Sequence, residues 1–295
     1  MPHYGLSGYL QFLVSGVSTG CIYVLIGLGL ITVYNVTGVI NLAQGEFVML
    51  GAMLAVVYDQ GIHLPLGLAF IASVLSVMTI GALVQRITIH PARHAPEVTL
   101  IIITIGTAIA LRGLGLLAWG TTPRTLPEFS RGAPLNLWGA VLSRQRIWIM
   151  GTAGAVLALL YGFFEFTLLG KAVRACAINR QIAQLAGINT EAMALLAYAL
   201  SAGMGAVAGI VIAPLTLVSY DMGLTLGLKG FVVAIMGGMV SAPAAVTGGL
   251  LLGILESLAS GTVSSGLKDA LAFLVLFAVL LGRTVRFGDI LRRRS

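Results

Sequence analysis

Charged residues are scarce in this chain, and acidic residues are the scarcest. Asp and Glu contribute 10 of the 295 residues, and the four charged types together reach only 9%, against roughly 25% in an average soluble domain. Before Glu46, His3 is the only side chain that ionises near neutral pH. Hydrophobic residues make up 58% of the chain, and the mean hydropathy is +1.01. No single soluble core can bury so much apolar surface, so the composition predicts an integral membrane protein.

Cysteine and histidine are also rare, which argues against several kinds of site. The two cysteines, Cys21 and Cys176, are far apart and lack metal-ligand spacing, so we expect neither a metal site nor a structural disulfide. The four histidines fall in termini or loops, and the sequence contains no HExxH, GxSxG or P-loop pattern. We therefore expect no catalytic residue and no cofactor in this chain. If ATP drives its activity, a separate chain hydrolyses the nucleotide.

Long apolar runs fill most of the sequence. A helix needs about 20 apolar residues to cross the hydrocarbon, and nine runs approach or exceed that length. They are Tyr9–Val33, Val39–Tyr58, Leu64–Val84, Val98–Trp119, Ile147–Leu169, Ala192–Val218, Gly227–Val240, Ala244–Leu258 and Leu267–Leu281. The seventh and eighth runs are short and lie three residues apart, so they are either two tilted spans or a re-entrant pair. The sequence predicts an all-α, polytopic bundle with eight or nine transmembrane helices.

The net charge of +7 comes mostly from cations at the ends of these runs. Ten Lys and Arg residues lie in Arg86–Glu97, Gly170–Asn189 and Arg283–Ser295, which nine crossings place on one side. The positive-inside rule makes that side cytoplasmic. Gly120–Arg146 then lies outside, although it carries four arginines. Cations in these positions favour contact with anionic membrane lipids, not with nucleic acid.

Gly170–Asn189 is a compact segment between two apolar runs. It carries Lys171, Arg174 and Arg180, no acidic residue and no Pro, and Gly187 is a helix stop signal. The pattern predicts a short cationic helix. Two interpretations stay open: the helix docks a cytoplasmic partner, or it only sets the orientation of the chain.

Polar residues open the second apolar run. In a regular helix Asn41, Gln44 and Gly45 share one face, while Glu46 points elsewhere. The shared face either lines a hydrophilic path or bonds neighbouring helices. An unpaired carboxylate at membrane depth is costly, so we expect Glu46 to be a structural charge with a cationic partner. Three cations are candidates: Arg86, Arg112 and Lys229.

Small residues recur at four-residue spacing, which lets helix backbones approach closely in lipid. The pairs and triplets are Gly16/Gly20, Ser201/Gly205/Gly209, Gly223/Gly227 and Gly249/Gly253. This spacing predicts tight helix packing, and it suits a transporter, a channel or a membrane enzyme equally.

Three blocks, in order along the chain, resemble permeases of the branched-chain amino-acid (Liv-type) ABC importers. Tyr34–Gly51 resembles the family's "Y…G…INxAxGE…GA" segment, and Gly170–Asn189 resembles its "GxxxRAxAxxxxxAxxxGIN" loop. Lys229–Gly253 is similar to the "K…A…GGxxSxxGAxxGGxxxG" block, with Ala244 where Gly is usual. The resemblance extends over nearly the whole chain and is closer to the H-like than to the M-like branch.

The resemblance implies one transmembrane permease domain over residues 1–295, in the bacterial inner membrane. It implies a homologous second permease chain, two ATPase subunits and a periplasmic or lipoprotein substrate-binding protein as partners. It also implies a cytoplasmic coupling helix at about 170–189 and a cytoplasmic basic tail at about 283–295. The residues assigned to ATPase coupling are Lys171, Arg174, Arg180 and Gly187. The Asn41, Gln44 and Gly45 face then borders the translocation path.

The resemblance does not fix the substrate. The candidate substrates are branched-chain or other amino acids, urea, short amides and aromatic acids. A stand-alone secondary transporter or channel that uses Glu46 for ion coupling is the alternative function, and a membrane scaffold is a third.

Overall fold

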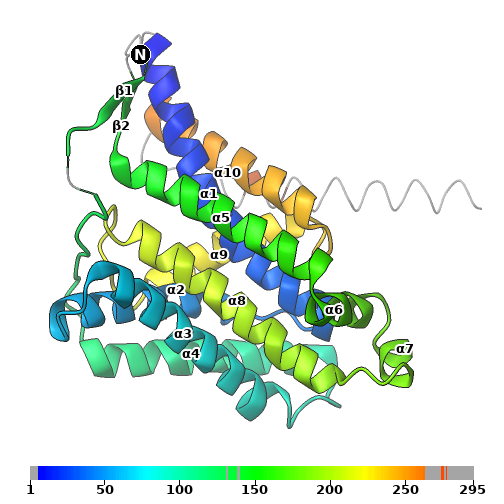
Figure 1. The fold of residues 1–295 in the computed structure, drawn as a ribbon. Coiled ribbons are helices and arrows are strands. Elements are labelled where there is room, and N and C mark those ends of the chain that lie inside the picture. The colour runs from blue at the N-terminus through cyan, green and yellow to red at the C-terminus, as the bar shows by residue number, and fades with distance from the viewer. Residues whose placement is uncertain (1–5, 131, 138–139, 263–273, 276, 278–295) are drawn as a thin grey trace, which may run out of the picture.

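The computed structural model describes residues 6–130, 132–137, 140–262, 274–275 and 277 (Figure 1). The predicted basic tail, Arg283–Ser295, lies outside the described residues, as does nearly all of the ninth predicted span, Leu267–Leu281.

Six helices of the described part are long and apolar enough to cross a membrane. They are α1 (Leu6–Thr37), α3 (Leu66–Val84, continued by the π-helical turn η2, Gln85–Ile89), α4 (Glu97–Trp119), α5 (Arg144–Phe166), α8 (Thr190–Ile212) and α10 (Ala242–Thr262). The chain is therefore a multi-pass, helical membrane protein, as the composition predicts. The total of eight or nine crossings stays a prediction.

Two further apolar helices are shorter. Helix α2 (Gln44–Val56) has 13 residues and is extended by the π-helical turn η1 (Val57–Gly61), and α9 (Met222–Met236) has 15 residues. At 1.5 Å per residue the two α-helices are about 20 Å and 23 Å long, less than the roughly 30 Å of the hydrocarbon core. The re-entrant alternative for the seventh and eighth runs is not confirmed, because α10 has 21 residues and is long enough to cross alone.

The connections contain regular structure of their own. Between α5 and α8 lie two short helices, α6 (Leu168–Ile178) and α7 (Arg180–Leu185). Between α4 and α5 lies a small antiparallel hairpin, β1 (Leu135–Leu137) and β2 (Ala140–Leu142), in which Asn136 pairs with Val141. No pattern in the sequence predicts this hairpin, which is an addition to the predicted all-α fold.

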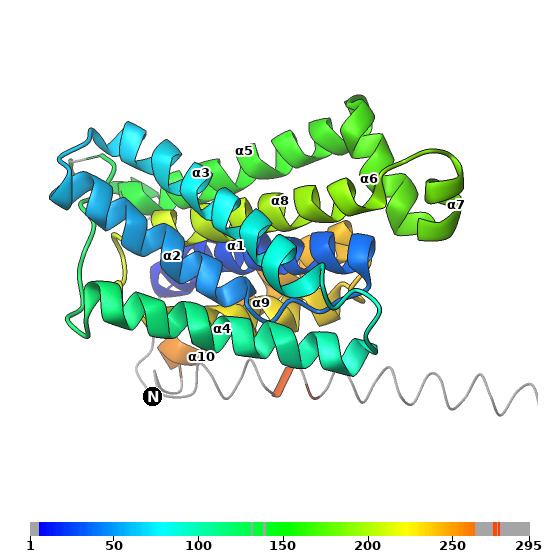
Figure 2. The same cartoon turned by 90° about the horizontal axis from the view of Figure 1, so that it is seen from below.

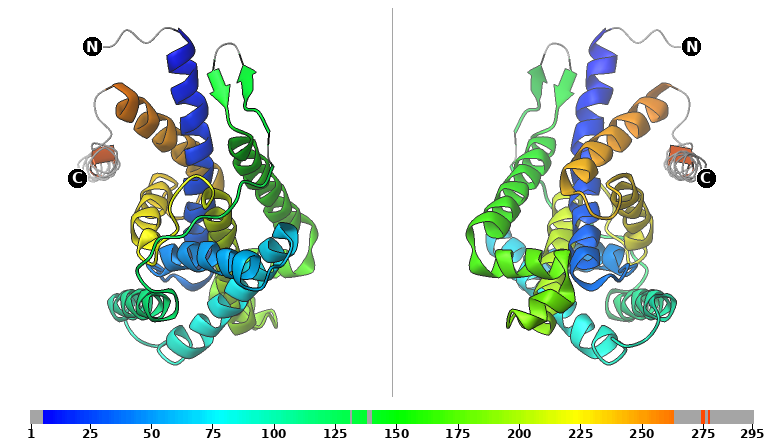
Figure 3. Two further views of the ribbon diagram at one scale, coloured as in Figure 1. Left: turned by 90° about the vertical axis from the view of Figure 1, so that its left-hand side faces the viewer. Right: turned by 90° about the vertical axis from the view of Figure 1, so that its right-hand side faces the viewer.

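Helices α1, α2 and α8 form the buried centre of the bundle, and α3, α4, α5 and α10 surround them (Figures 2 and 3). Side chains on the outer faces of the surrounding helices are apolar and exposed, as at Ile71, Ile109 and Leu159. The surrounding helices are therefore apolar on their inner faces, which contact the central helices, and on their outer faces, which suit contact with lipid.

The connections gather at two opposite ends of the bundle (Figures 1 and 2). Glu191, at the start of α8, pairs with His90 in the α3–α4 connection, so the predicted cationic segments share one end. At the other end, Gln11 of α1 bonds both backbone groups of Val141 in the hairpin, at 2.9 Å and 2.7 Å. This arrangement agrees with the predicted sidedness of Arg86–Glu97, Gly170–Asn189 and Gly120–Arg146. That the α6–α7 end is cytoplasmic stays a prediction.

Glycine spacing produces the close packing of α1 on α10. A Cβ added at Gly16 would lie 2.6 Å from the Cα of Ile254, and one at Gly20 would lie 2.8 Å from the carbonyl oxygen of Gly249. Only residues without a side chain permit such contact between two backbones. The close approach predicted from the four-residue spacing is confirmed here.

Candidate functional site

Helix α2 begins at Gln44, five residues later than the second apolar run. Residues 39–43 form a non-helical turn, and Leu42 donates its backbone N–H to the Thr104 hydroxyl of α4 at 3.3 Å. Within the turn, Asn41 Oδ1 accepts the backbone N–H two residues on, at 3.2 Å. The prediction that a regular helix carries Asn41 and Gln44 on one face was therefore wrong. The turn, not a helical face, positions Asn41.

Gln44 joins three central helices. Its Nε2 donates to the Ser201 carbonyl of α8 at 3.0 Å, and the Ser201 hydroxyl lies 2.6 Å from Gln44 Oε1 and 2.8 Å from the Gly29 carbonyl of α1. Gly29 lies eight residues before the end of α1 at Thr37, which corresponds to about 12 Å along the helix. Helix α2 thus starts deep inside the bundle. The Gln44 amide bonds neighbouring helices, one of the two roles left open by the sequence.

Gly45 brings the start of α2 against the start of α9. A Cβ at Gly45 would meet the Gly223 carbonyl oxygen and would lie 2.9 Å from the Cα of Gly227. The first turns of the two short helices are therefore in backbone contact, and each helix begins within the bundle.

Glu46 pairs with Arg112 of α4, one of the three candidate cations. Glu46 Oε1 accepts from Arg112 Nη2 at 2.5 Å and from Nε at 3.2 Å. Glu46 is only 1% exposed. It was expected to point away from Asn41 and Gln44, yet it lines the same cavity as both of them.

That cavity lies between α2, α4 and α9 and has a volume of about 190 Å³. Its polar lining is Asn41, Gln44, Glu46 and Arg112. The apolar lining comes from α1, α2, α4 and α9 and from the turn before α2: Leu30, Leu42, Gly45, Ile105, Ala108, Ile109, Gly223, Leu224, Gly227, Leu228 and Phe231. Ile109 and Leu224 are 63% and 49% exposed, so the cavity borders the outward face of α4 and α9.

Two polar atoms of the cavity lining are buried without a partner. Among the described residues, nothing hydrogen-bonds to Asn41 Nδ2 or to Glu46 Oε2. A buried polar atom left unpaired costs about 1–3 kcal/mol, and such atoms are uncommon in folded proteins. One is a donor and the other an acceptor, and together they make this cavity the main candidate for a solute site.

A second buried charge pair lies between α9, α10 and α1. Lys229 Nζ donates to Glu256 Oε1 at 2.7 Å, and the Tyr23 hydroxyl donates to Glu256 Oε2 at 2.8 Å. Lys229, a candidate partner of Glu46, therefore pairs with a different carboxylate. Lys229 and Glu256 are 8% and 5% exposed, so both charges lie inside the bundle. In the described part of the chain, no group of three His, Cys, Asp or Glu side chains could hold a metal ion.

The predicted cationic helix consists of two helices, α6 and α7, which break at Asn179. The Asn179 side chain caps α7 by accepting from two backbone N–H groups at 3.0 Å each. Asn189 caps α8 in the same way, and Thr167 caps α6 by accepting from one backbone N–H. Gly187, with φ of +82°, follows α7, so the predicted helix stop is confirmed while the single helix was wrong.

Helix α7 presents an apolar ridge at this end of the bundle. Ile182 and Leu185 of α7 are 63% and 88% exposed, and Ile178, the last residue of α6, is 87% exposed. Ile182 and Leu185 are three residues apart, so they lie on one face of α7. Large exposed apolar side chains outside the spans mark a protein interaction surface.

The three cations of this segment are placed differently from one another. Lys171 and Arg174 are exposed, and Arg174 pairs with Glu165 of α5 at 2.8 Å. Arg180 is half-buried and lines a small pocket with residues of the α3–α4 connection.

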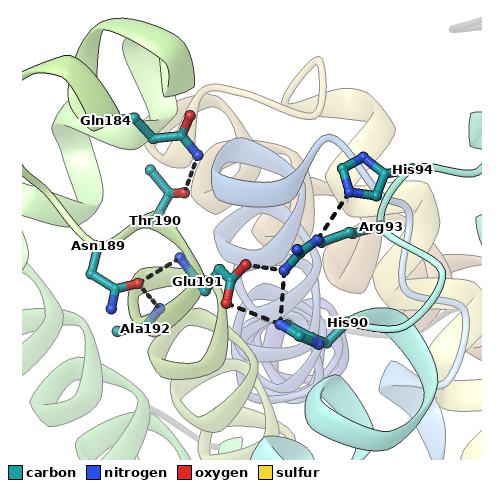
Figure 4. Close-up of polar contacts among 8 residues, drawn as sticks. All are labelled: His90, Arg93, His94, Gln184, Asn189, Thr190, Glu191 and Ala192. Atoms are coloured by element: carbon teal, nitrogen blue, oxygen red, sulfur yellow. Dashed lines mark hydrogen bonds and ion pairs between the residues drawn. The ribbon is translucent and has the colours of Figure 1, made fainter.

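A polar cluster joins α7, α8 and the α3–α4 connection (Figure 4). Glu191 accepts from Arg93 and lies 2.9 Å from the His90 ring nitrogen. Gln184 of α7 donates to the Thr190 hydroxyl at 2.8 Å. The α6–α7 segment is therefore fixed to α8, which itself carries Ser201.

Comparison with known proteins agrees with this architecture. The family model described as the permease component of branched-chain amino acid transport systems matches residues 12–280. The high-affinity branched-chain amino acid transport system permease protein LivH is 33% identical in Salmonella typhimurium and in Escherichia coli K12, over 92% of this chain and 93% of each relative. The corresponding protein BraD of Pseudomonas aeruginosa is 31% identical over 93% of this chain and 94% of its own length.

A solved structure, PsaBC from Streptococcus pneumoniae in complex with Fab, has a similar fold. It matches 92% of this chain and 90% of its own with a TM-score of 0.52, at 15% identity. The family resemblance drawn from the three sequence blocks is confirmed. The chain belongs to the permease component family of branched-chain amino acid transport systems.

Proposed function

We propose that this chain is the transmembrane permease subunit of an ATP-driven ABC importer in the bacterial inner membrane. Its cargo is a small polar solute, with branched-chain and related amino acids as the leading candidates. The observation that carries the proposal is the cavity at the start of α2 and α9, which is lined by buried polar atoms that have no partner. Polar and charged groups at membrane depth are costly, and they are typical of transport pathways.

The translocation path runs beside Asn41, Gln44 and Gly45, each with a separate task. Asn41 offers a side-chain donor to the path. Gln44 and Gly45 hold the walls together, the first by its bonds to α8 and the second by its contact with α9. Glu46 is the structural charge that fixes the Arg112 guanidinium at the cavity edge.

A homologous second permease chain covers the face formed by α4 and α9. This face borders the cavity and carries exposed apolar side chains, such as Ile109 and Leu224. A second chain here would enclose the path between two permeases. A periplasmic or lipoprotein binding protein would deliver substrate at the hairpin end.

The segment of α6 and α7 docks one of two ATPase subunits at the opposite end. The apolar ridge of α7 enters the partner, while Lys171, Arg174 and Arg180 contribute charge and Gly187 fixes the turn into α8. Hydrophobic anchors with a polar rim are typical of such interfaces.

Reconstitution tests the proposed function. The chain is co-expressed with its partner chains, purified and placed in proteoliposomes with the binding protein. We expect an ATPase to co-purify, and we expect solute uptake to require ATP. Uptake by this chain alone, driven by an ion gradient without ATP, would refute the importer and support a secondary transporter.

A charge on the α7 ridge tests the docking surface. Ile182→Asp places a carboxylate where an apolar contact is expected, so ATPase co-purification and stimulated ATP hydrolysis should fall about tenfold or more. Gln181→Asp is the matched control, because it adds the same charge to the same exposed helix without removing an apolar side chain. Equal effects of the two substitutions would contradict a ridge-specific contact.

A further inference from the structure

The unpartnered atoms of the α2–α4–α9 cavity have opposite hydrogen-bonding character. Asn41 Nδ2 can only donate, and Glu46 Oε2 can only accept while the carboxylate is ionised. Both residues are buried, with exposures of 0% and 1%. A solute that satisfies both atoms must carry an acceptor and a donor of its own.

Electrostatics decides the kind of donor and acceptor. Glu46 and Arg112 already neutralise one another, and Asp221 at the start of α9 interacts electrostatically with Glu46. A donor placed at Glu46 Oε2 is therefore favoured when it is positively charged. The Arg112 guanidinium and Asn41 Nδ2 together favour an acceptor that is negatively charged.

A solute with both charges adds no net charge to this site. Asp221 is exposed and does not line the cavity, and the two charges that do, Glu46 and Arg112, sum to zero. A cation or an anion alone would therefore bring an uncompensated charge into a region of low dielectric constant, which is costly. The pairing thus favours a zwitterion over either single ion.

The size and the walls of the cavity limit the rest of the solute. A volume of 190 Å³ holds about six water molecules at roughly 30 Å³ each. The remaining lining is apolar, with Ile105, Leu224 and Phe231 among its side chains. A small zwitterion with a short apolar group fits this lining.

Resting on the proposed function, we propose that the permease itself contains a recognition site for the ammonium and carboxylate groups of its solute. Glu46 Oε2 binds the ammonium group, and Asn41 Nδ2 binds the carboxylate beside Arg112. Selection for a zwitterion then occurs inside the membrane domain, in addition to any selection by a binding protein. Urea, simple amides and aromatic acids lack the ammonium group and are rejected at this point.

Binding to the unaltered protein gives the first test. The full-length chain with its partner chains, in nanodiscs and without binding protein, is dialysed against radiolabelled L-leucine. Isocaproate, which lacks the ammonium group, and isoamylamine, which lacks the carboxylate, are used as competitors. We expect leucine to bind about tenfold or more tightly than either analogue. Absence of leucine binding, or isocaproate binding as tightly as leucine, would overturn the proposal.

Two isosteric variants assign the groups. Glu46→Gln should weaken the binding of leucine and isoamylamine about tenfold and should not weaken that of isocaproate, because it leaves the Arg112 charge uncompensated. Asn41→Asp keeps the Oδ1 acceptor of the turn but removes the donor. It should therefore weaken the binding of leucine and isocaproate and should not weaken that of isoamylamine. Glu256→Gln is the matched control, because it neutralises a buried carboxylate in another part of the bundle. It should lower the stability and leave the three affinities unchanged.

The outcomes separate this inference from the proposed function. If leucine uptake requires ATP but the variants keep the wild-type order of affinities, the recognition site is refuted and the importer stands. If uptake never requires ATP, the importer is refuted. If Glu46→Gln fails to fold, the competition series on the wild type still tests whether the site recognises both the ammonium and the carboxylate group.

Discussion

Gly45→Ala is the substitution whose effect follows most directly from the backbone contact of α2 with α9. The added Cβ would meet the Gly223 carbonyl oxygen and would lie 2.9 Å from the Cα of Gly227. Both neighbours are backbone atoms of α9, so no side chain can rotate away. The two helices must separate, and the cavity wall moves with them.

Two opposing contributions determine how far Gly45→Ala changes the free energy of unfolding. Replacing Gly by Ala inside a helix normally stabilises it by up to about 1 kcal/mol. Overpacking costs about 1–3 kcal/mol, and more when the backbone must shift. The net effect is a destabilisation of about 1–2 kcal/mol, or a decrease in the melting temperature of about 2–8 °C for a domain of this size class.

Thermal unfolding of the purified protein in nanodiscs measures this effect, and leucine uptake by the reconstituted complex should fall in parallel. Gly154→Ala is the matched control, because Gly154 lies in α5 with no atom within 4 Å of an added Cβ. It should leave the melting temperature unchanged or raise it slightly. If Gly45→Ala were as stable as the wild type, the argument from close backbone contact would be refuted.

Three further predictions follow from other contacts. Lys229→Met leaves the buried Glu256 carboxylate without its cation and should cost about 3–5 kcal/mol of stability, while adding Glu256→Leu should recover most of the loss in the same unfolding assay. Asn189→Ala removes the cap of α8 and should cost about 1 kcal/mol, seen as faster hydrogen exchange in the first turn of that helix; unchanged exchange would contradict it. In a cysteine-free background, an impermeant maleimide should label a cysteine at Arg93 only from the cytoplasm and one at Arg124 only from outside, and labelling from one side would overturn the predicted sidedness.

The six long apolar helices and the glycine contacts of α1 with α10 were predictable because they depend on local sequence. A run of apolar residues must be covered by lipid or protein wherever it lies, and four-residue spacing puts Gly16 and Gly20 on one face in any helix. The stop at Gly187 is local as well. Family membership was also accessible, since it depends on sequence blocks and not on packing.

The candidate site depends on contacts that no local pattern contains. Thr104, 62 residues from Leu42, binds the non-helical turn that carries Asn41. Lys229 was one of three candidate partners for Glu46, and its pairing with Glu256 becomes visible only when α9 and α10 are packed together. Ser201 went unnoticed as the partner of Gln44, because small polar residues are common in helices of this kind.

Helix α8 carries two bonded residues that connect distant parts of the bundle. Glu191 in its first turn is tied to the α3–α4 connection, and Ser201, ten residues further on, is tied to Gln44. The two points are about 15 Å apart on one continuous helix, and a hydrogen-bonded helix is stiff along its axis. A push on the capped corner at Asn189 therefore displaces Ser201 as well, and with it the first residue of α2 at the cavity wall. The helix thus links the α6–α7 end of the bundle to the cavity through one continuous element.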